Sequence, residues 1–453
     1  MSILRLPVEL ILLILRGMSL KDVLHITRAC SYLRMISLNF KELWVHTFDA
    51  ANLPLPLGET LDTIDATLLP RYAQREVSIQ SKWEEPMITP IRSLEPTDIY
   101  ALPTPCIPEG VTPLGPFCCL LPGGLLFVLG RATAVGLYHI NGRFGHYFEK
   151  VGRVLAIDWM SEDNGASIYL GFLIGTGKRY TSGRSLCIYS LTQHTKKNPV
   201  VSQPKYYPLA PYTEGLSMKH SLILTWGPET TSLLMLDPVS GDAMNLLPAL
   251  DEPSMKVLHA DLHPSDPSTM VLLATGPQHI YRLLVVRNVA KPGVSTLKQG
   301  IPLVTELLNS VDDPGLIIHP AHHGPGFPPF AIWVENEATG VVYIDPNSTT
   351  PLWTIQHPST PVLPSEPVYT GSQFFRACST STGRLFLFVM RDQQVGFFQY
   401  QRGSSLANMK TLDPIATEFV TKREDSQLQR ITFDPVLGIL VLVANPRVLI
   451  LQY

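Results

Sequence analysis

The amino-acid sequence predicts a multidomain α+β chain in which a small helical domain, a linker and a large all-β domain follow one another. Apolar residues recur at helical spacing over residues 1–50, prolines are frequent over 51–110, and short runs of β-branched and aromatic residues recur over 111–453. A length of 453 residues is sufficient for two or three domains of about 150 residues each. We therefore place domain boundaries near residues 50 and 110.

The composition excludes several classes of protein. The 35 Lys and Arg residues nearly balance the 38 Asp and Glu residues, so the formal net charge of −3 provides no basic field for nucleic acid. Hydrophobic residues make up 45% of the chain and charged residues 16%, which indicates a large core rather than disorder. The six cysteines form no CxxC pair, and no apolar run is long enough to span a membrane. We expect a reduced intracellular protein, cytoplasmic or nuclear, that binds neither membranes nor nucleic acid.

The first fifty residues predict three short helices. Pro7 and Glu9 are typical of a helix start, and Ser19 followed by Asp22 is a capping pattern for a second helix. A third helix fits Lys41–Phe48. Three short helices cannot bury all the large apolar side chains of this segment, so the surplus indicates a surface that awaits a partner protein. The surplus side chains are Leu6, Leu12, Leu13 and Trp44.

Several short motifs follow one another in the same segment. They read Leu6-Pro7-x-Glu9-Leu10, Ile14-Leu15, Ser19-Leu20-x-Asp22-Val23-Leu24, Arg28-Ala29-Cys30-Ser31 and Leu43-Trp44. In this order, over about forty residues, the segment resembles an F-box, which is a three-helix module. Two departures are that Met18 replaces the usual leucine and that Tyr32-Leu33 replaces a polar residue followed by tryptophan.

The F-box resemblance implies that the segment binds a Skp-family adaptor protein. The residues carried over by motif position are Leu6, Pro7, Glu9, Leu10, Ile14, Leu15, Leu20, Val23, Leu24 and Trp44. Some of them must instead pack the helices against one another, and the sequence alone does not divide the set.

The linker over residues 51–110 contains one predicted helix at about 72–85. Val77, Ile79 and Trp83 are apolar among charged residues there, as in an amphipathic helix. Six prolines between Pro86 and Pro108 follow the helix and favour an extended chain. We expect a rigid spacer whose Trp83 docks onto the neighbouring domain.

The β region contains one strong apolar strand in each of seven units, beginning at residues 125, 167, 221, 269, 330, 384 and 437. These starts are 42 to 61 residues apart, and a second strand usually follows, which is the pattern of a β-propeller. Seven blades would take about 49 residues each, near the usual ~40–50. Two stacked β-sandwiches are the alternative. Because the last blade runs out of chain after its third strand, ring closure needs an outer strand from Asp98–Leu102 or Cys106–Val111.

The sequence contains no evident catalytic, cofactor-binding or metal-binding constellation. Repeated Asp-Pro pairs occur where strands turn and are typical of hairpins. The histidines of 319–323 fall in a loop rich in proline and glycine, and the pair His259 and His263 has no third metal ligand. Gly175–Arg179 departs from a phosphate-binding loop, and Cys118-Cys119 precedes an apolar strand, as core thiols do.

An F-box followed by a propeller resembles the substrate receptors of Skp/cullin/F-box ubiquitin ligases. The resemblance implies that the adaptor, and through it a cullin, binds the F-box, and that the propeller holds a target protein. Such a chain performs no bond chemistry and needs no cofactor, because it contributes proximity. The alternatives are a propeller hydrolase with an N-terminal helical cap and an F-box scaffold that recruits nothing for degradation.

The predicted target site lies in the long loop Thr192–Pro208. Lys196, Lys197, Tyr206 and Tyr207 combine basic and aromatic side chains there, which suits an acidic or phosphorylated segment of a target. The alternative is that these residues form an ordinary solvated loop.

Overall fold

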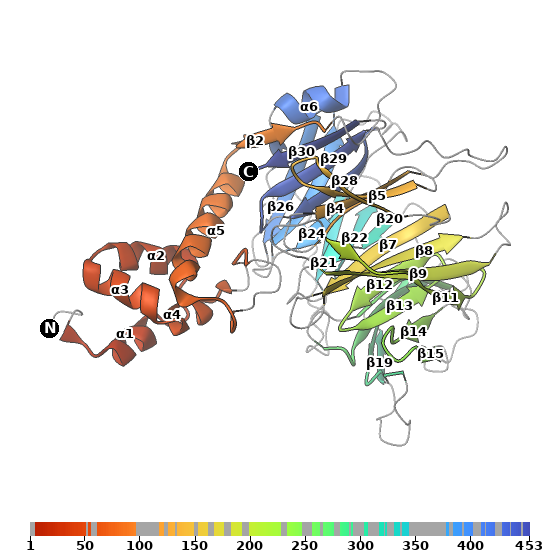
Figure 1. Ribbon diagram of the computed structural model, residues 1–453, viewed down its shortest axis with the longest axis horizontal. Helices are drawn as coiled ribbons and strands as arrows, with labels where there is room; N and C mark the ends of the chain where they lie inside the picture. The colour runs from red at the N-terminus through yellow and green to blue at the C-terminus, as the bar shows by residue number, and fades with distance from the viewer. Residues whose placement is uncertain are drawn as a thin grey trace.

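The computed structural model describes the chain between residues 5 and 453 with gaps. The described ranges are 5–50, 53–55, 61–96, 117–121, 126–131, 134–148, 153–161, 167–175, 183–192, 199–227, 233–246, 256–262, 266–275, 281–289, 291–292, 303–306, 317–320, 322–323, 330–335, 338–343, 377–379, 384–391, 394–401, 409–412, 414–421, 428–434, 436–444 and 447–453. They form an N-terminal helical region followed by a mostly β domain (Figure 1).

The helical unit consists of four short helices where the sequence predicted three. They are α1 (Val8–Leu15), α2 (Leu20–Arg28), α3 (Ser31–Asn39) and α4 (Glu42–Val45). Ser19 caps α2 as predicted, because its Oγ accepts the N–H of Asp22 at 3.0 Å. The missed helix is α3, which begins after Cys30, whose Sγ accepts the N–H of Leu33 at 3.5 Å.

A long helix, α5 (Leu69–Glu84), follows the short 3₁₀ turn η3 (Ala66–Leu68) and joins the helical unit to the β domain (Figure 1). It begins three residues before the predicted helix, with a proline in its first turn. Leu69 and Ala73 pack in the core of the helical unit, whereas Ile79 and Trp83 pack in a core of the β domain. The two ends of one helix are therefore buried in different units.

Trp83 docks onto the β domain, as the sequence predicted. It is buried, and its ring lies 5.0 Å from that of Tyr453, 5.2 Å from Phe433 and 6.1 Å from Phe397, measured between centroids. The backbone oxygen of Trp83 also accepts a hydrogen bond from Lys410 Nζ. Helix α5 is thus fixed to the last part of the chain.

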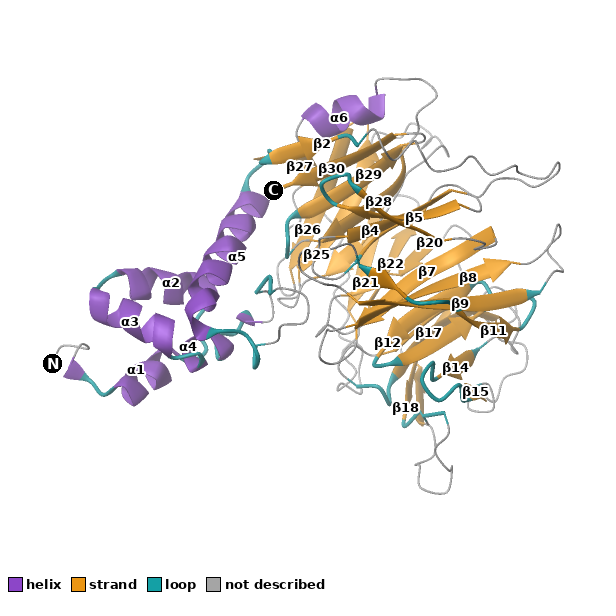
Figure 2. Cartoon of the chain, in the orientation of Figure 1, coloured by secondary structure: helices purple, strands orange, loops and turns teal. Residues whose placement is uncertain are grey.

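The described strands of the β domain form seven sheets (Figure 2). In spatial order, the first sheet is β3 (Phe117–Leu120), β4 (Leu126–Arg131), β5 (Ala134–His139), β6 (Phe144–Phe148). The second is β10 (Val200–Val201), β9 (Arg184–Thr192), β8 (Ser167–Gly175), β7 (Arg153–Ser161), with β11 (Lys205–Leu209) also paired to β9. The third is β12 (Gly215–Lys219), β13 (Leu222–Trp226), β14 (Leu234–Leu236), β15 (Ala243–Asn245). The fourth is β16 (Lys256–Leu262), β17 (Met270–Thr275), β18 (Tyr281–Arg287), β19 (Leu303–Glu306).

Of the remaining three sheets, the sixth and seventh combine a strand from residues 87–94 with strands from the later part of the chain. The fifth is β20 (Ile317–Pro320), β22 (Phe330–Glu335), β23 (Ala338–Tyr343). The sixth is β1 (Met87–Ile88), β27 (Met409–Leu412), β26 (Gln394–Gln401), β25 (Arg384–Arg391), β24 (Ala377–Ser379), β21 (His322–His323), and helix α6 (Pro414–Thr421) follows β27 in the chain. The seventh is β2 (Arg92–Leu94), β30 (Arg447–Gln452), β29 (Ile439–Ala444), β28 (Leu428–Asp434).

The seven apolar strands predicted from the sequence are all present, and each begins within two residues of its predicted start. They are β4, β8, β13, β17, β22, β25 and β29, one in each of the seven sheets. The histidine cluster was predicted wrongly as a loop. His319 lies in β20 and His322–His323 form β21, and these two strands belong to different sheets.

Several pairs of neighbouring sheets share hydrophobic cores among the described residues. One core joins the first and second sheets through Phe148 and Phe172, another joins the second and third through Leu186 and Ile223, and a third joins the third and fourth. The last sheet packs on the first through a further core that includes Tyr138 and others. In addition, Thr432 Oγ1 of β28 accepts the N–H of Leu120 of β3 at 3.3 Å.

The outer strand of the seventh sheet is β2, which pairs antiparallel with β30 in the register Ser93 to Leu451. The sequence predicted a strand from a later segment at this position, 98–102 or 106–111. Both candidates lie outside the described residues, and β2 occupies this edge of the sheet. Strand β1 likewise adds to the sixth sheet by pairing parallel with β27. The segment after α5 is therefore not a free spacer but part of two sheets. Among the described residues, no helix has the length and apolar character needed to cross a membrane.

Candidate functional site

Helix α1 has apolar residues around most of its circumference, with Glu9 as its one charged residue. Ile11 and Leu15 are buried in the helical unit, but Leu10, Leu13 and Ile14 are 45%, 62% and 53% exposed. A single helix cannot bury two opposite faces against the same neighbours, so one apolar face remains in solvent.

Phe48 adds a fourth exposed apolar side chain, at 69% exposure. Its N–H donates to the carbonyl of Met18 at 3.3 Å, and the N–H of Gly17 donates to the carbonyl of His46 at 2.9 Å. These two bonds tie the chain after α4 to the chain after α1. We call Leu10, Leu13, Ile14 and Phe48 the apolar face.

The structure divides the ten residues predicted to bind an adaptor. Pro7, Glu9, Leu10 and Ile14 are exposed, and Leu6 is half-buried. The other five are buried and pack the helices together instead: Leu15, Leu20, Val23, Leu24 and Trp44. Trp44 is fully buried, and its Nε1 donates to the carbonyl of Ser37 at 2.8 Å. The helical unit itself covers these five in this structure, and their contact with an adaptor stays a prediction.

The apolar face includes residues that motif positions did not identify. Leu13 was recognised as surplus hydrophobicity but falls outside the motif. Phe48 was predicted as an apolar residue of the helix Lys41–Phe48, but α4 ends at Val45 and Phe48 is exposed. The continuous apolar run of α1 was the only sequence signal for Leu13.

The predicted target site is only partly described. Lys196 and Lys197 lie outside the described residues, whereas Tyr206 and Tyr207 lie in β11, a strand and not the predicted loop. Tyr206 is 51% exposed. Tyr207 is half-buried, and its hydroxyl donates to the carbonyl of Pro238 at 3.0 Å, which links the second sheet to the third. Of the four predicted residues, Tyr206 is the one that the structure shows to be accessible.

A polar cluster lies between β7 of the second sheet, β12 of the third and β16 of the fourth. Asp261 of β16 accepts hydrogen bonds from Ser217 Oγ and Lys219 Nζ of β12, each at 2.5 Å. Asp158 of β7 accepts the N–H of Met218 at 2.8 Å and the N–H of the next residue, Trp159, at 2.9 Å. The cluster thus connects three consecutive sheets.

Burial controls the ionisation of this polar cluster. Loss of hydration raises the pKa of Asp158 to about 7, against the lowering effect of its two backbone hydrogen bonds. Loss of hydration also lowers the pKa of His259, on β16, to about 4. Ser217 Oγ donates to the Asp261 carboxylate, which is also paired with Lys219, so the hydroxyl belongs to an ion-paired network between two sheets.

Other candidates for chemistry have structural explanations. Cys118 and Cys119 are buried in β3, and burial raises the pKa of the Cys187 thiol to about 11, so this thiol is un-ionised near neutral pH. Within the described ranges, no group of three His, Cys, Asp or Glu residues is placed to hold a metal ion.

No family model and no curated protein matches the chain. Among solved structures, prolyl oligopeptidase B from Galerina marginata is 10% identical, with 86% of this chain and 53% of that chain covered and a TM-score of 0.43. A prolyl endopeptidase is 13% identical over 72% of this chain and 45% of that chain, with a TM-score of 0.40. The Pan2 WD40 domain of Neurospora crassa is 11% identical over 72% of this chain and 85% of that chain, with a TM-score of 0.39.

The chain spans about half the length of the two peptidases. At these identities and TM-scores, the likenesses assign neither family nor activity, so the function has to be argued from the chain's own residues.

Proposed function

We propose that this protein is the substrate-recognition subunit of a Skp/cullin/F-box ubiquitin ligase. The observation that carries the proposal is the apolar face: four large side chains are 45% to 69% exposed on a helical unit whose core is already closed by other residues. Exposed clusters of this kind are typical of protein-binding sites. Their partner in this proposal is a Skp-family adaptor, which in turn binds a cullin.

The β domain is proposed to be a closed seven-bladed propeller that holds the target protein. Three observations support it: the seven sheets in chain order, the shared cores between neighbouring sheets, and the packing of the last sheet on the first. Strand β2 would then act as the closing strand, because it completes the sheet that contains the C-terminal strand. Exposed Tyr206 remains the proposed target contact.

Helix α5 supports the proposal that the helical unit binds the adaptor while the β domain binds the target. It has 16 residues, which corresponds to about 24 Å at 1.5 Å per residue, and its two ends are buried in the helical unit and in the β domain. A rigid connection of this kind would hold a bound target at a fixed distance from the ligase. The chain then contributes proximity and performs no bond chemistry itself.

The test is the affinity of the full chain for a purified Skp-family adaptor. Burying an aliphatic side chain is worth about 1.5–3 kcal/mol, so Leu10→Asp combined with Leu13→Asp should weaken binding tenfold or more. Both residues are exposed, so the helical content should stay unchanged by circular dichroism. Isothermal titration calorimetry measures the affinity, and recovery of cullin from a cell extract gives a second readout.

The matched control is Val239→Asp, which also replaces an exposed aliphatic residue, at 69% exposure, but lies in the β domain. It should bind the adaptor like the unsubstituted chain. Equal affinity of the Leu10/Leu13 variant and the Val239 variant would contradict the proposal. Adaptor binding without ubiquitination of any captured protein, in a reconstituted ligase, would instead identify a scaffold.

A further inference from the structure

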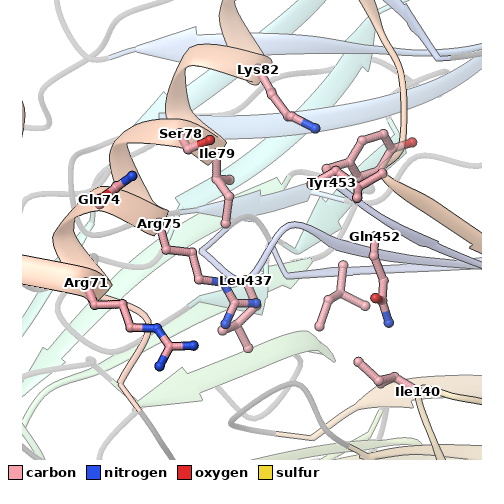
Figure 3. A pocket seen from close by; sticks show the side chains of 12 residues that line it. Arg71, Gln74, Arg75, Ser78, Ile79, Lys82, Ile140, Leu437, Gln452 and Tyr453 are labelled. Carbon is pink, nitrogen blue, oxygen red and sulfur yellow. The ribbon is translucent and has the colours of Figure 1, made fainter. Parts of the chain in front are cut away.

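A groove of about 500 Å³ lies between α5 and the seventh sheet, with further lining from the first sheet (Figure 3). Its volume is within the range of about 300–1,000 Å³ that ligand sites usually have. One wall is the face of α5 that carries Arg71, Arg75 and Lys82. The floor includes Leu437, Ile439 and Tyr453, which are at most 8% exposed.

The three cations of the wall share one face because of their spacing. Arg75 and Lys82 follow Arg71 by four and eleven residues, close to whole numbers of helical turns. Figure 3 shows both arginine side chains and the lysine side chain extending from α5 over the groove. Arg71 and Arg75 are exposed and Lys82 is half-buried, so all three remain accessible from solvent.

The positive charge of this wall is little compensated by the described residues around it. Within that part of the chain, no carboxylate forms an ion pair with Arg71 or Lys82. Asp434 interacts with the charge of Arg75 and so compensates one of the three cations in part; its Oδ1 also accepts the N–H groups of Val436 and Leu437 at 3.0 and 2.9 Å. A protein with a net charge of −3 thus concentrates three cations over an apolar floor.

The geometry favours an extended peptide over other anionic ligands. Arg71 and Arg75 are about 6 Å apart along the helix axis, and Lys82 is about 10 Å further, so one anion suits the arginines and a second suits the lysine. An extended chain covers that separation in about three to five residues, at 3.3 Å each. The apolar floor needs apolar side chains between the anions, which inorganic phosphate lacks.

We propose that this groove binds an extended segment of a partner protein that carries two anionic side chains, phosphoserine or glutamate, separated by a few mainly apolar residues. The site is independent of the adaptor-binding proposal, since it uses a different surface and other residues. One wall is α5, which joins the helical unit to the β domain, so an occupied groove would also stiffen that junction.

The test uses three randomised peptide libraries on the immobilised full chain. Two positions four residues apart are fixed as phosphoserine, as glutamate or as serine. The unsubstituted chain should retain the phosphoserine and glutamate libraries at least tenfold more than the variant Arg71→Gln/Arg75→Gln/Lys82→Gln, and should not retain the serine library. Hydrogen exchange with an enriched peptide should show protection within 71–82 and 437–453.

The matched control is Lys21→Gln/Arg28→Gln/Arg34→Gln, which removes the same charges from exposed positions of the helical unit. It should retain the libraries like the unsubstituted chain. Equal retention by the two triple variants, or retention of the serine library, would overturn the proposal. Equal protection by inorganic phosphate alone would replace the peptide with a simple anion, and groove-dependent binding only of phosphatidylinositol phosphate vesicles would replace it with a lipid surface.

Discussion

The apolar face of the helical unit and the polar cluster of the β domain are opposite exceptions to the usual distribution of residues. Helix α1 exposes three large apolar side chains on one face, Leu13 among them, whereas the polar cluster buries Asp261, which is only 6% exposed. The carboxylates of the cluster have partners: Asp261 accepts hydrogen bonds from Ser217 and Lys219, and the half-buried Asp158 accepts them from backbone N–H groups. The exposed apolar residues have no cover within the described part of the chain. The polar cluster is thus satisfied within the fold, whereas the apolar face is left for the partner that we propose.

The largest expected effect separates the core of the helical unit from its apolar face. Trp44→Ala removes a fully buried indole and its hydrogen bond to Ser37, and should destabilise the helical unit by about 3–5 kcal/mol. Leu13→Ala, on the apolar face, should leave stability nearly unchanged while weakening adaptor binding. Chemical denaturation followed by circular dichroism measures the stability of the two variants, and isothermal titration calorimetry measures their affinity for the adaptor. A large loss of stability in the Leu13 variant would show that the face is part of the fold.

A smaller effect tests the buried charges of the β domain. Asp261→Asn breaks the ion pair with Lys219. The Asp261 side chain is only 9% exposed, against 39% for that of Glu95, so this substitution should cost about 2–3 kcal/mol. The control is Glu95→Gln, which breaks the Arg447 pair at the surface, where ion pairs contribute about 0–1 kcal/mol. Similar losses of unfolding free energy for the two variants would contradict a structural role for the cluster.

The smallest expected effect is a change in the pH dependence of stability. The folded-state pKa of Asp158 is raised to about 7. Its protonated form therefore contributes to the free energy of unfolding fully below about pH 4, and this contribution is lost as the pH rises to about 7. The folded-state pKa of His259 is lowered to about 4. Its neutral form therefore contributes to the free energy of unfolding fully above about pH 6.5, and this contribution is lost as the pH falls to about 4. The two slopes oppose each other between pH 4 and 6.5.

Asp158→Asn removes one of these two slopes. The unfolding free energy of this variant should therefore rise more steeply with pH between 4 and 6.5 than that of the unsubstituted chain. The slope is the relevant readout, because the substitution also removes a hydrogen-bond acceptor and shifts the absolute stability. Denaturant titrations at half-unit pH steps measure it, and parallel pH profiles for the two proteins would show that Asp158 is not titrating in this range.

Much of the β domain was predictable because its strands are continuous apolar runs. The strand at Ser167–Gly175 is an example: it is predominantly apolar and bounded by residues typical of turns. Strand β2 was missed because three residues between prolines carry no pattern of their own, and only pairing with β30 makes them a strand. Helix α3 was missed because Ser31, Ser37 and Asn39 are weak helix formers, and packing of Leu33 and Ile36 overrides that tendency.

The polar cluster and the groove were not predictable from local sequence. Asp261 lies 44 residues from Ser217, and Asp158 lies 60 residues from Met218, so no spacing rule connects them. In the groove, Arg71, Arg75 and Lys82 looked like the solvated face of an amphipathic helix. Their role depends on which sheet α5 packs against, and that is decided by Trp83 and its aromatic neighbours. The sequence identified Trp83 as the docking residue but not the surface that receives it.

The pairing of β2 with β30 also determines the order in which the two units can fold during synthesis on the ribosome. Glu95, one residue beyond β2, bonds Arg447, which is 352 residues later in the chain. At about 5–20 residues per second, a ribosome needs roughly 20 to 70 seconds to make the intervening chain. During that time β1, β2 and Trp83 have no sheet to join, while the helical unit already contains all of α1–α4. The first unit to fold on the ribosome should therefore be the helical one, and nascent chains shorter than about 450 residues should bind the adaptor before they have a complete β domain.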